Sequence, residues 1–339
     1  MQSPRPPQKP RRWLRATVAV ATWLVLIVTA AVWGVLQWGD EWWPATLIMF
    51  SPRWVWLAPP IVMVLVSAIA RRRSLIPATI ALGLAVWPIM GLCIPWRTWL
   101  ETAPAAEFKL RILTCNMHYG KTDPRLLDSL VAELRPDVVA LQEWRDSAKS
   151  IEMFKPEWHT HRVGALFLAS RHPILDMERL GPDSSNPKGL AARYELVTPN
   201  GSVQVFSLHL ESPREGLDQV AGQGSNGKQR LEANTARRRE QSEYLASQAA
   251  RFAGPRLIAG DFNTPPESVL FDTVWTGNRD AFAEAGLGWG WTFFNRYTSV
   301  RIDHILVDGS GKILRCWVAP DVGSPHRPVI ADVSWPSRN

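Results

Sequence analysis

The spacing of apolar residues along the chain changes sharply near residue 100. Before that point the apolar residues form three long runs, at about residues 13–38, 50–70 and 75–97. Each run approaches the ~20 residues that a helix needs to cross the hydrocarbon core of a bilayer. After that point the apolar runs are short and are separated by polar turns, which is typical of a globular domain. The pattern predicts a membrane domain of three transmembrane helices over residues 1–105 and a globular domain over residues 106–339.

Basic residues are placed unevenly around the apolar runs. A basic cluster between residues 9 and 15 begins the first run, and Arg71, Arg72 and Arg73 separate the second run from the third. Short loops rich in Lys and Arg stay on the cytoplasmic side of a membrane, so three crossings place the globular domain on the far side. If the second run, which contains Pro59 and Pro60, does not span the bilayer, the globular domain is cytoplasmic instead.

Short apolar segments beyond residue 106 predict many strands and few helices. Helices are expected over residues 125–134 and 231–252, each followed by a proline that cannot continue it. Residues 216–227 are rich in Gly, Gln and Ser and are expected to form a mobile loop. Strands are expected over residues 110–116, 138–142, 165–169, 191–197, 203–210, 256–259, 302–307 and 313–318. This content predicts an α+β fold with helices outside packed sheets.

Charge differs between the two predicted domains. The whole chain has a net charge of +7, but residues 1–107 hold ten Lys and Arg against four Asp and Glu, whereas residues 108–339 hold 28 against 27. The basic excess therefore belongs to the membrane region, where it sets topology. The globular domain lacks the overall positive charge typical of proteins that bind nucleic acid. Eleven of the 18 Trp precede residue 100, and six flank the apolar runs, as an interfacial aromatic belt would.

Polar residues suited to metal and phosphate chemistry recur at the ends of predicted strands. Six fragments carry them, namely residues 113–117 with Asn116, 137–143 with Glu143, 207–211 with His209, 260–263 with Asp261 and Asn263, 301–305 with Asp303, and 324–328 with His326. Each fragment alone has an ordinary alternative, since Gly-Asp-Phe-Asn can be a simple turn and a strand His is often a core residue. If the strand ends meet in one cleft, their oxygen-rich side chains suit Mg²⁺ or Mn²⁺.

In this order, the six fragments resemble the motifs of the endonuclease/exonuclease/phosphatase superfamily, the DNase I-like hydrolases. The resemblance covers about two thirds of the chain and is closest to bacterial members with several N-terminal membrane spans, among them the teicoplanin-resistance-type proteins. It implies a four-layer α/β/β/α sandwich of two mixed β-sheets and a metal-dependent phosphoesterase. With the predicted spans, it implies a multi-pass protein of the bacterial inner membrane whose catalytic domain is extracytoplasmic.

The resemblance also implies roles for the polar residues at the strand ends. Glu143 is the main carboxylate ligand of Mg²⁺, and Asn116 lies beside the metal. Asp261 and Asn263 hold the attacking water and a phosphate oxygen. In physical terms, the metal neutralises charge that builds on the phosphoryl oxygens as water attacks.

Two imidazoles complete the implied site. His326 is the general base, or the group that polarises the water, and Asp303 fixes its tautomer, as Asp–His pairs do in other hydrolases. His209 contacts the phosphate and stabilises its charge, or helps to protonate the leaving group. The chain departs from the family at Pro325, where members usually have an acidic residue before the final His. This departure puts a second metal position in doubt and leaves open a non-catalytic member.

Several other charged positions have a structural and a functional interpretation. Arg193 lies in a predicted strand and is a candidate phosphate contact, although a solvated strand Arg fits the pattern as well. Arg237, Arg238 and Arg239 are expected to form a solvated face of the helix over residues 231–252. His304 follows Asp303 in a strand, so its side chain is expected to point to the opposite face, outside the site.

Three functions are compatible with these features. The preferred one is hydrolysis of a phosphate mono- or diester in a phosphorylated lipid or envelope metabolite, because the anchor holds the cleft close to the bilayer. The second is an extracytoplasmic nuclease, which the motifs permit and the charge does not favour. The third is a non-catalytic membrane receptor that binds phosphate groups. The expected partners are the lipid bilayer and a phosphorylated small molecule or lipid, with nucleic acid disfavoured.

Overall fold

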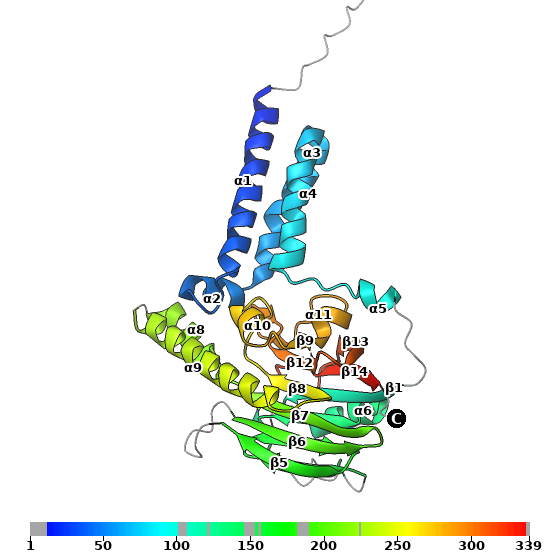
Figure 1. The fold of residues 1–339 in the computed structure, drawn as a ribbon. Helices are drawn as coiled ribbons and strands as arrows, with labels where there is room; N and C mark the ends of the chain where they lie inside the picture. The colour runs from blue at the N-terminus through cyan, green and yellow to red at the C-terminus, as the bar shows by residue number, and fades with distance from the viewer. Residues whose placement is uncertain are drawn as a thin grey trace, which may run out of the picture.

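The computed structural model describes residues 12–100, 107–120, 123–145, 153–154, 157–181, 190–223 and 225–336. Its N-terminal helices project from one end of a layered β-sandwich, and the rest of the chain forms the sandwich and its covering helices (Figure 1). The change in apolar spacing near residue 100 therefore corresponds to a change in architecture.

The sandwich consists of two six-stranded sheets with strand orders β13-β14-β1-β2-β4-β3 and β5-β6-β7-β8-β12-β9. The first sheet contains β1 (Glu107–Asn116), β2 (Val138–Gln142), β3 (His159–Val163), β4 (Leu166–Ser170), β13 (Lys312–Val318) and β14 (Val329–Pro336). The second contains β5 (Ile174–Leu180), β6 (Leu190–Thr198), β7 (Gly201–His209), β8 (Arg256–Asp261), β9 (Asn278–Asp280) and β12 (Asp303–Asp308). Both sheets are mixed, because β1 and β2 are parallel, as are β7 and β8, among antiparallel neighbours.

The eight predicted strands are confirmed, and the structure adds several others. β3 and β5 are edge strands whose residues are mostly exposed or partly exposed, and neither shows a regular alternation of apolar and polar residues. A short hairpin of β10 (Phe293–Phe294) and β11 (Ser299–Val300) lies outside the two main sheets. Short helices occur at η4 (His118–Gly120), α10 (Val269–Thr273) and α11 (Ala281–Ala285).

Alternation along the strands produces the layers. On β8, Leu257 and Ala259 belong to the core between the two sheets, whereas Ile258 packs outward with Leu245 of α9 (Ser225–Ala250). On the other side, α6 (Pro124–Leu134) covers the first sheet through Leu127 and neighbouring residues. The order helix, sheet, sheet, helix confirms the predicted α+β sandwich.

The described residues of the segment expected to be a mobile loop belong instead to two packed helices, α8 (Arg214–Gln223) and α9 (Figure 1). A Cβ on Gly216 would lie 2.6 Å from the Cα of Leu231, and one on Gly227 would lie 2.4 Å from the backbone N of Val220. These glycines allow the two helices to approach closely. The loop prediction was wrong because composition alone does not distinguish a flexible glycine from one in a close contact.

Three helical segments pack together in an N-terminal bundle (Figure 1). They are α1 (Arg12–Leu36), η1 (Arg53–Leu57) continued by α3 (Ala58–Ala70), and α4 (Leu75–Leu84) continued by a π-helical turn (Ala85–Ile89). The first two segments are long and apolar enough to cross a membrane. The third predicted span, 75–97, is corrected: its helix ends at residue 89, because the chain then crosses to the sandwich, where Cys93 pairs with Gly288. The connections contain α2 (Trp43–Phe50), η2 (Arg72–Ser74) and α5 (Trp96–Leu100).

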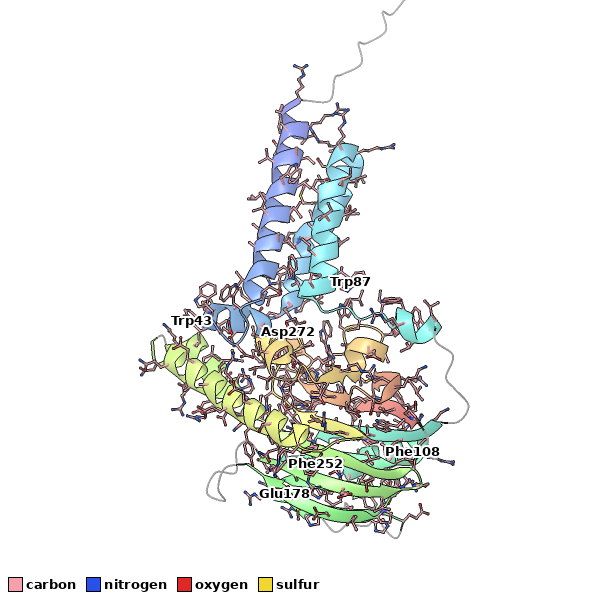
Figure 2. The ribbon with its side chains drawn as sticks, viewed as in Figure 1. Trp43, Trp87, Phe108, Glu178, Phe252 and Asp272 are labelled. Atoms are coloured by element: carbon pink, nitrogen blue, oxygen red, sulfur yellow. The ribbon has the colours of Figure 1, made fainter. Side chains whose placement is uncertain are left out.

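Two buried ion pairs fix the base of the bundle to the sandwich. Asp40, in the turn after α1, pairs with Arg238 of α9 and accepts a hydrogen bond from Ser268 Oγ at 2.6 Å. Arg53, at the start of η1, pairs with Glu267 at 2.6 Å. Figure 2 shows Trp43 and Trp87 at this junction. The bundle therefore has a fixed contact with the sandwich.

The expected solvated face of Arg237–Arg239 is only partly present. The Arg237 side chain is 53% exposed, but the Arg238 side chain is fully buried in its pair with Asp40. A buried charge without a partner is strongly destabilising, so Arg238 requires the carboxylate that the N-terminal segment supplies. The prediction was wrong for Arg238 because its partner lies about two hundred residues away in the sequence.

Candidate active site

The candidate site residues occupy the ends of neighbouring strands. Asn116 ends β1, His209 ends β7, Asp261 ends β8, and Asp303 begins β12. Strand register places Asp261 beside His209 on one side and opposite Asp303 on the other. On its own strand, each of these residues lies an even number of positions from residues that face the core between the sheets. Their side chains therefore meet at one end of the inter-sheet space.

Gly260 allows β8 to reach this position. Its φ is +148°, and a Cβ there would lie 2.0 Å from the carbonyl oxygen of Leu208 on β7, so a larger residue would push the two strands apart. After Asp261 the chain turns, and the Asn263 N–H donates to Asp261 Oδ1 at 2.8 Å. The Gly-Asp-Phe-Asn fragment is thus a strand end and a turn together, with both polar side chains buried.

Glu143, Asp261 and Asn116 form a compact carboxylate–carboxamide cluster. Asn116 Nδ2 donates to Glu143 Oε1 at 3.1 Å and to Asp261 Oδ2 at 3.0 Å. His209 Nε2 lies 3.7 Å from those same two oxygens. Burial and the Asp303 carboxylate raise the pKa of Asp261. Glu143 also has a left-handed backbone, with φ of 49°, a strained conformation for this residue that often marks functional positions.

This donor set fits a hard divalent cation. Neither Glu143 nor Asp261 is paired with a Lys or Arg within the described parts of the chain, and buried carboxylates require compensating positive charge. Carboxylate and carboxamide oxygens are preferred ligands of Mg²⁺. A second group, Asp261, Asp303 and His326, also has ligand-type atoms within 4.8 Å of one another. Asp303 and His326 bind each other, however, so the Glu143 side is the better cation position.

His326 and Asp303 form a buried pair beside this cluster. His326 Nδ1 lies 2.9 Å from Asp303 Oδ2, and its Nε2 lies 3.9 Å from Asp261 Oδ2. The backbone N–H of His326 donates to Ser324 Oγ at 3.1 Å, and this hydrogen bond stabilises the loop. Burial lowers the pKa of His326, but Asp303, Asp261 and Glu143 outweigh it and raise the pKa to about 9. The pair is therefore suited to hold positive charge on the ring.

His304 lies on the other face of β12, as strand alternation predicts. Its Nδ1 lies 2.7 Å from Asp280 Oδ2, and its Nε2 lies 2.9 Å from the carbonyl oxygen of Thr264. Phe262 packs against the edge of the ring. His304 thus supports the structure behind the site and does not face the cluster.

A cavity of about 910 Å³ opens over the cluster. Its lining includes the predicted residues Asn116, Glu143, His209, Asp261, Asn263 and His326. Glu211 also lines the cavity, and no role was predicted for it, although strand periodicity places it on the same side as His209. Leu47 and Phe50 of α2 line the cavity as well, and no local signal identifies them, because only the tertiary fold brings α2 there.

Arg193 lies outside this cavity. Its guanidinium group pairs with Asp176 and with Glu178 at 3.4 Å, donates to Gln204 Oε1 at 2.9 Å, and lies over the Phe252 ring at 4.5 Å. Figure 2 shows Glu178 and Phe252 at the end of the sandwich away from the bundle. The structure therefore does not bring Arg193 to the site, and the predicted phosphate contact is not retained.

Comparison with known proteins agrees with this geometry. The model of the Endonuclease/Exonuclease/phosphatase family matches residues 113–337, a span that contains all the candidate site residues. The chain belongs to this family. Its members hydrolyse phosphoester bonds, so the predicted reaction class is confirmed. A search of curated proteins finds no match to the sequence.

Solved structures of the same fold are distant in sequence. A family protein from Bacteroides thetaiotaomicron is 16% identical, with a TM-score of 0.52, over 68% of this chain and 98% of that chain. One from Bacteroides vulgatus is 17% identical, with a TM-score of 0.52, over 67% and 99%. Humanized D. rerio TDP2 with 14 mutations is 16% identical, with a TM-score of 0.51, over 66% and 98%. These similarities support the DNase I-like sandwich and do not identify a substrate.

Proposed function

We propose that the protein is a membrane-anchored, divalent-metal-dependent phosphoesterase acting on a phosphorylated lipid or envelope metabolite. The observation that carries this proposal is the composition of one cavity. Its floor holds the Glu143–Asp261 cluster, and its wall includes Leu47 and Phe50 from the segment between the two long apolar helices. A phosphate at the floor would therefore lie next to the part of the chain that approaches the bilayer.

The side chains support a hydrolytic mechanism. Glu143, with Asn116 beside it, would hold Mg²⁺ or Mn²⁺, which supplies positive charge to the phosphoryl oxygens. Asp261 and Asn263 position the attacking water and a phosphate oxygen. His326 takes up a proton from this water at Nε2.

Two other groups support the charge changes in this reaction. Asp303 accepts the hydrogen bond from His326 Nδ1, which fixes the tautomer of the ring and stabilises its positive charge. His209 stabilises negative charge on the phosphate or helps to protonate the leaving group.

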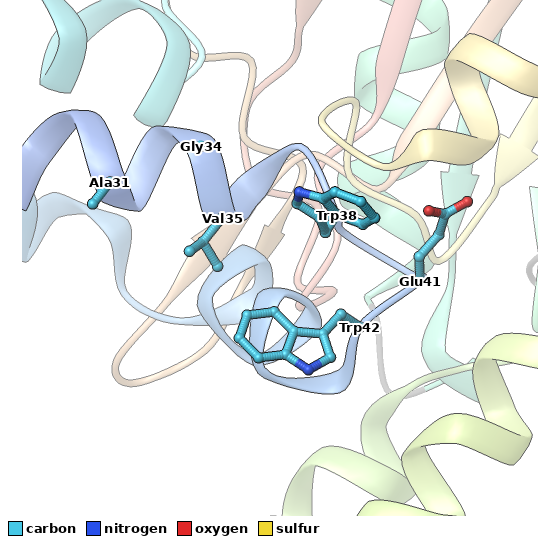
Figure 3. Close-up of a pocket in the computed structure, with 6 residues that line it drawn as sticks. All are labelled: Ala31, Gly34, Val35, Trp38, Glu41 and Trp42. Carbon is cyan, nitrogen blue, oxygen red and sulfur yellow. The ribbon is translucent and has the colours of Figure 1, made fainter.

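The base of α1 has the aromatic surface expected where a protein crosses from bilayer to water. Trp38 and Trp42 are 58% and 50% exposed. A groove of about 780 Å³ is lined by Ala31, Gly34, Val35, Trp38, Glu41 and Trp42. These residues lie at the end of α1 and in the turn that follows it (Figure 3). Trp side chains gather at membrane–water interfaces. This surface supports a bilayer boundary at the base of the bundle, close to the sandwich.

The cavity walls disfavour nucleic acid as the substrate. Acidic residues predominate over Arg in the described lining, which holds Glu143, Glu211, Glu215, Asp218 and Asp261 against Arg214. Glu215 pairs with Arg230, and Asp218 lies 3.7 Å from Arg214, but the cavity stays acidic overall. Proteins bind nucleic-acid backbones through rows of Lys and Arg. An acidic cavity with one cation position suits a single phosphate better than a polyanion.

A substrate panel tests the proposed function. The full chain, purified in detergent with Mg²⁺, should hydrolyse a lipid phosphate and a water-soluble aryl phosphoester faster than it degrades plasmid DNA. His326→Ala is the control for contaminating activity and should hydrolyse the substrates roughly 10²–10⁴-fold more slowly. Rapid plasmid degradation without lipid phosphate hydrolysis would identify a nuclease. Tight phosphate binding without any hydrolysis would identify the non-catalytic receptor.

A reporter fusion tests the proposed extracytoplasmic position of the catalytic domain, which rests on the basic N-terminus and the Arg71–Arg73 loop. A reporter that is active only after export should be active when fused after residue 105. A reporter that is active only in the cytoplasm should be silent at the same position. The reverse pattern would mean an even number of crossings, because α4 and its π-helical turn would then not span the bilayer.

A further inference from the structure

We infer that α2 forms the wall of the catalytic cavity that binds a hydrocarbon chain of the substrate, and that Leu47 and Phe50 select the substrate by this chain. The inference rests on the proposed function and adds to it the residues that contact the apolar part of the substrate. It makes the N-terminal segment a part of the active site as well as an anchor.

The cavity is lined by two chemically different groups of side chains. The floor is formed by carboxylates, carboxamides and imidazoles at the strand ends. The lining also includes apolar side chains, namely Leu47 and Phe50 of α2, Leu217 of α8, and Phe293 and Phe294. A phosphate group needs only the floor, and 910 Å³ is far more space than one phosphate fills. The apolar part of the lining therefore fits the remainder of an amphiphilic substrate.

The orientation of α2 follows from its burial pattern. Ala45, Thr46 and Met49 are buried, so these residues attach the helix to its surroundings. Leu47 and Phe50 are only partly buried, and they line the cavity. A helix with no charged residue thus presents apolar side chains to a cavity whose floor is highly polar.

The α2 wall is held in place from both sides. Thr298 Oγ1, in the β10–β11 hairpin, lies within hydrogen-bond distance of the carbonyl oxygens of Phe50 at 3.3 Å and Ser51 at 3.2 Å. Trp54 Nε1 donates to the Tyr297 carbonyl oxygen at 3.3 Å. Phe50 also packs against the apolar cluster that joins α1, α2 and the π-helical turn. The α2 wall is therefore a fixed part of the N-terminal bundle.

A hydrocarbon chain is the occupant that these features favour. The wall is apolar, it adjoins helices whose outward surfaces are apolar, and it ends at a floor built for phosphate. A lipid phosphate whose chain comes from the bilayer side would contact Leu47 and Phe50 while its phosphate reaches Glu143 and His326. A sugar or peptide phosphate would leave this apolar surface exposed to water. Burial of each additional methylene should then raise kcat/KM by ~4-fold until the wall is filled.

A chain-length series tests the inference on the full chain in phospholipid nanodiscs. The probes are butyl, hexyl and octyl phosphates and the corresponding alkyl p-nitrophenyl phosphates, with p-nitrophenyl phosphate and its bis ester as chain-free references. For the natural sequence, kcat/KM should rise from butyl to octyl. Phe50→Ala and Leu47→Ala should each lower kcat/KM for the octyl probe about tenfold, and for the butyl probe by no more than about twofold.

Ile48→Ala is the matched control. Ile48 lies on the same helix and packs against the same apolar cluster as Phe50, but it does not line the cavity. It should lower stability in a similar way and leave the chain-length dependence unchanged. If Phe50→Ala does not fold, Phe50→Leu and Leu47→Ala provide the same comparison, because Leu47 is not part of that cluster.

The outcomes separate the inference from the proposed function. The inference would be overturned by equal rates for the butyl and octyl probes, or by the same change in chain-length dependence for Ile48→Ala and Phe50→Ala. Hydrolysis of the chain-free references would still support the proposed phosphoesterase in either case. Absence of hydrolysis of every probe with Mg²⁺ or Mn²⁺ would overturn both. A chain-length dependence that Phe50→Ala and Leu47→Ala abolish, and Ile48→Ala retains, supports the inference.

Discussion

His326→Ala and Asp303→Ala are each expected to lower turnover by roughly 10²–10⁴-fold, the range for positioned acid–base groups. The double variant should be little worse than the worse single variant. His326 Nδ1 lies 2.9 Å from Asp303 Oδ2, and both side chains are buried. Without the carboxylate the ring loses its fixed tautomer and the charge that supports protonation. Residues that act as one unit give non-additive losses.

Steady-state kinetics of the three variants and the natural sequence provide this comparison. Pro325 precedes His326, so no adjacent carboxylate is present to replace Asp303. His304→Gln is the matched control, because His304 lies on the same strand and faces Asp280 on the opposite side. It should change turnover far less than Asp303→Ala. Fully additive losses for the pair would show that His326 and Asp303 act separately.

Glu143→Gln is expected to lower turnover by at least ~10²-fold and to weaken the dependence on Mg²⁺, because a metal ion supplies several kcal/mol of transition-state stabilisation. Asn116 carries no charge, so Glu143 is the carboxylate on which the predicted cation chiefly depends. The substitution keeps the size of the side chain and an acceptor for Asn116 Nδ2, which now donates at 3.1 Å. The effect should therefore reflect lost charge.

Two measurements check this prediction. Activity is titrated with Mg²⁺ and Mn²⁺ after chelation, and Mn²⁺ binding is followed directly by electron paramagnetic resonance, which does not depend on turnover. Glu211→Gln is the control, because Glu211 also lines the cavity but is held by Asn234 at 3.0 Å and by Arg237. Near-normal activity of the natural sequence in excess chelator would refute the metal assignment.

Sequence order and strand periodicity were sufficient for the main outline of the sandwich and for the expectation that most of the candidate site residues lie together. The predicted strands over residues 110–116, 203–210 and 256–259 correspond to β1, β7 and β8, because their apolar residues alternate or run continuously as buried strands require. The polar residues that end them then meet by register, as Asp261 and His209 do. Strand alternation also excluded His304 correctly.

Sequence reasoning failed where a residue's environment depends on a distant partner. The fold buries Arg193 and Arg238 against carboxylates, in one case Asp176 and in the other Asp40. Gly216 and Gly227 suggest flexibility by composition, but they permit a close helix contact. In each case the decisive contact joins segments that are separated in sequence.

The sequence by itself determined the α+β class and the order of the motifs that place the chain in its family, and it predicted a division near residue 100. These features depend on local spacing and on residue type, which the chain displays directly. The tertiary structure decided which carboxylates lie together, where the third helix ends, and that Leu47 and Phe50 line the cavity above Asp261. These features depend on packing between segments, since the energy of a buried charge or apolar side chain is set by its neighbours in space.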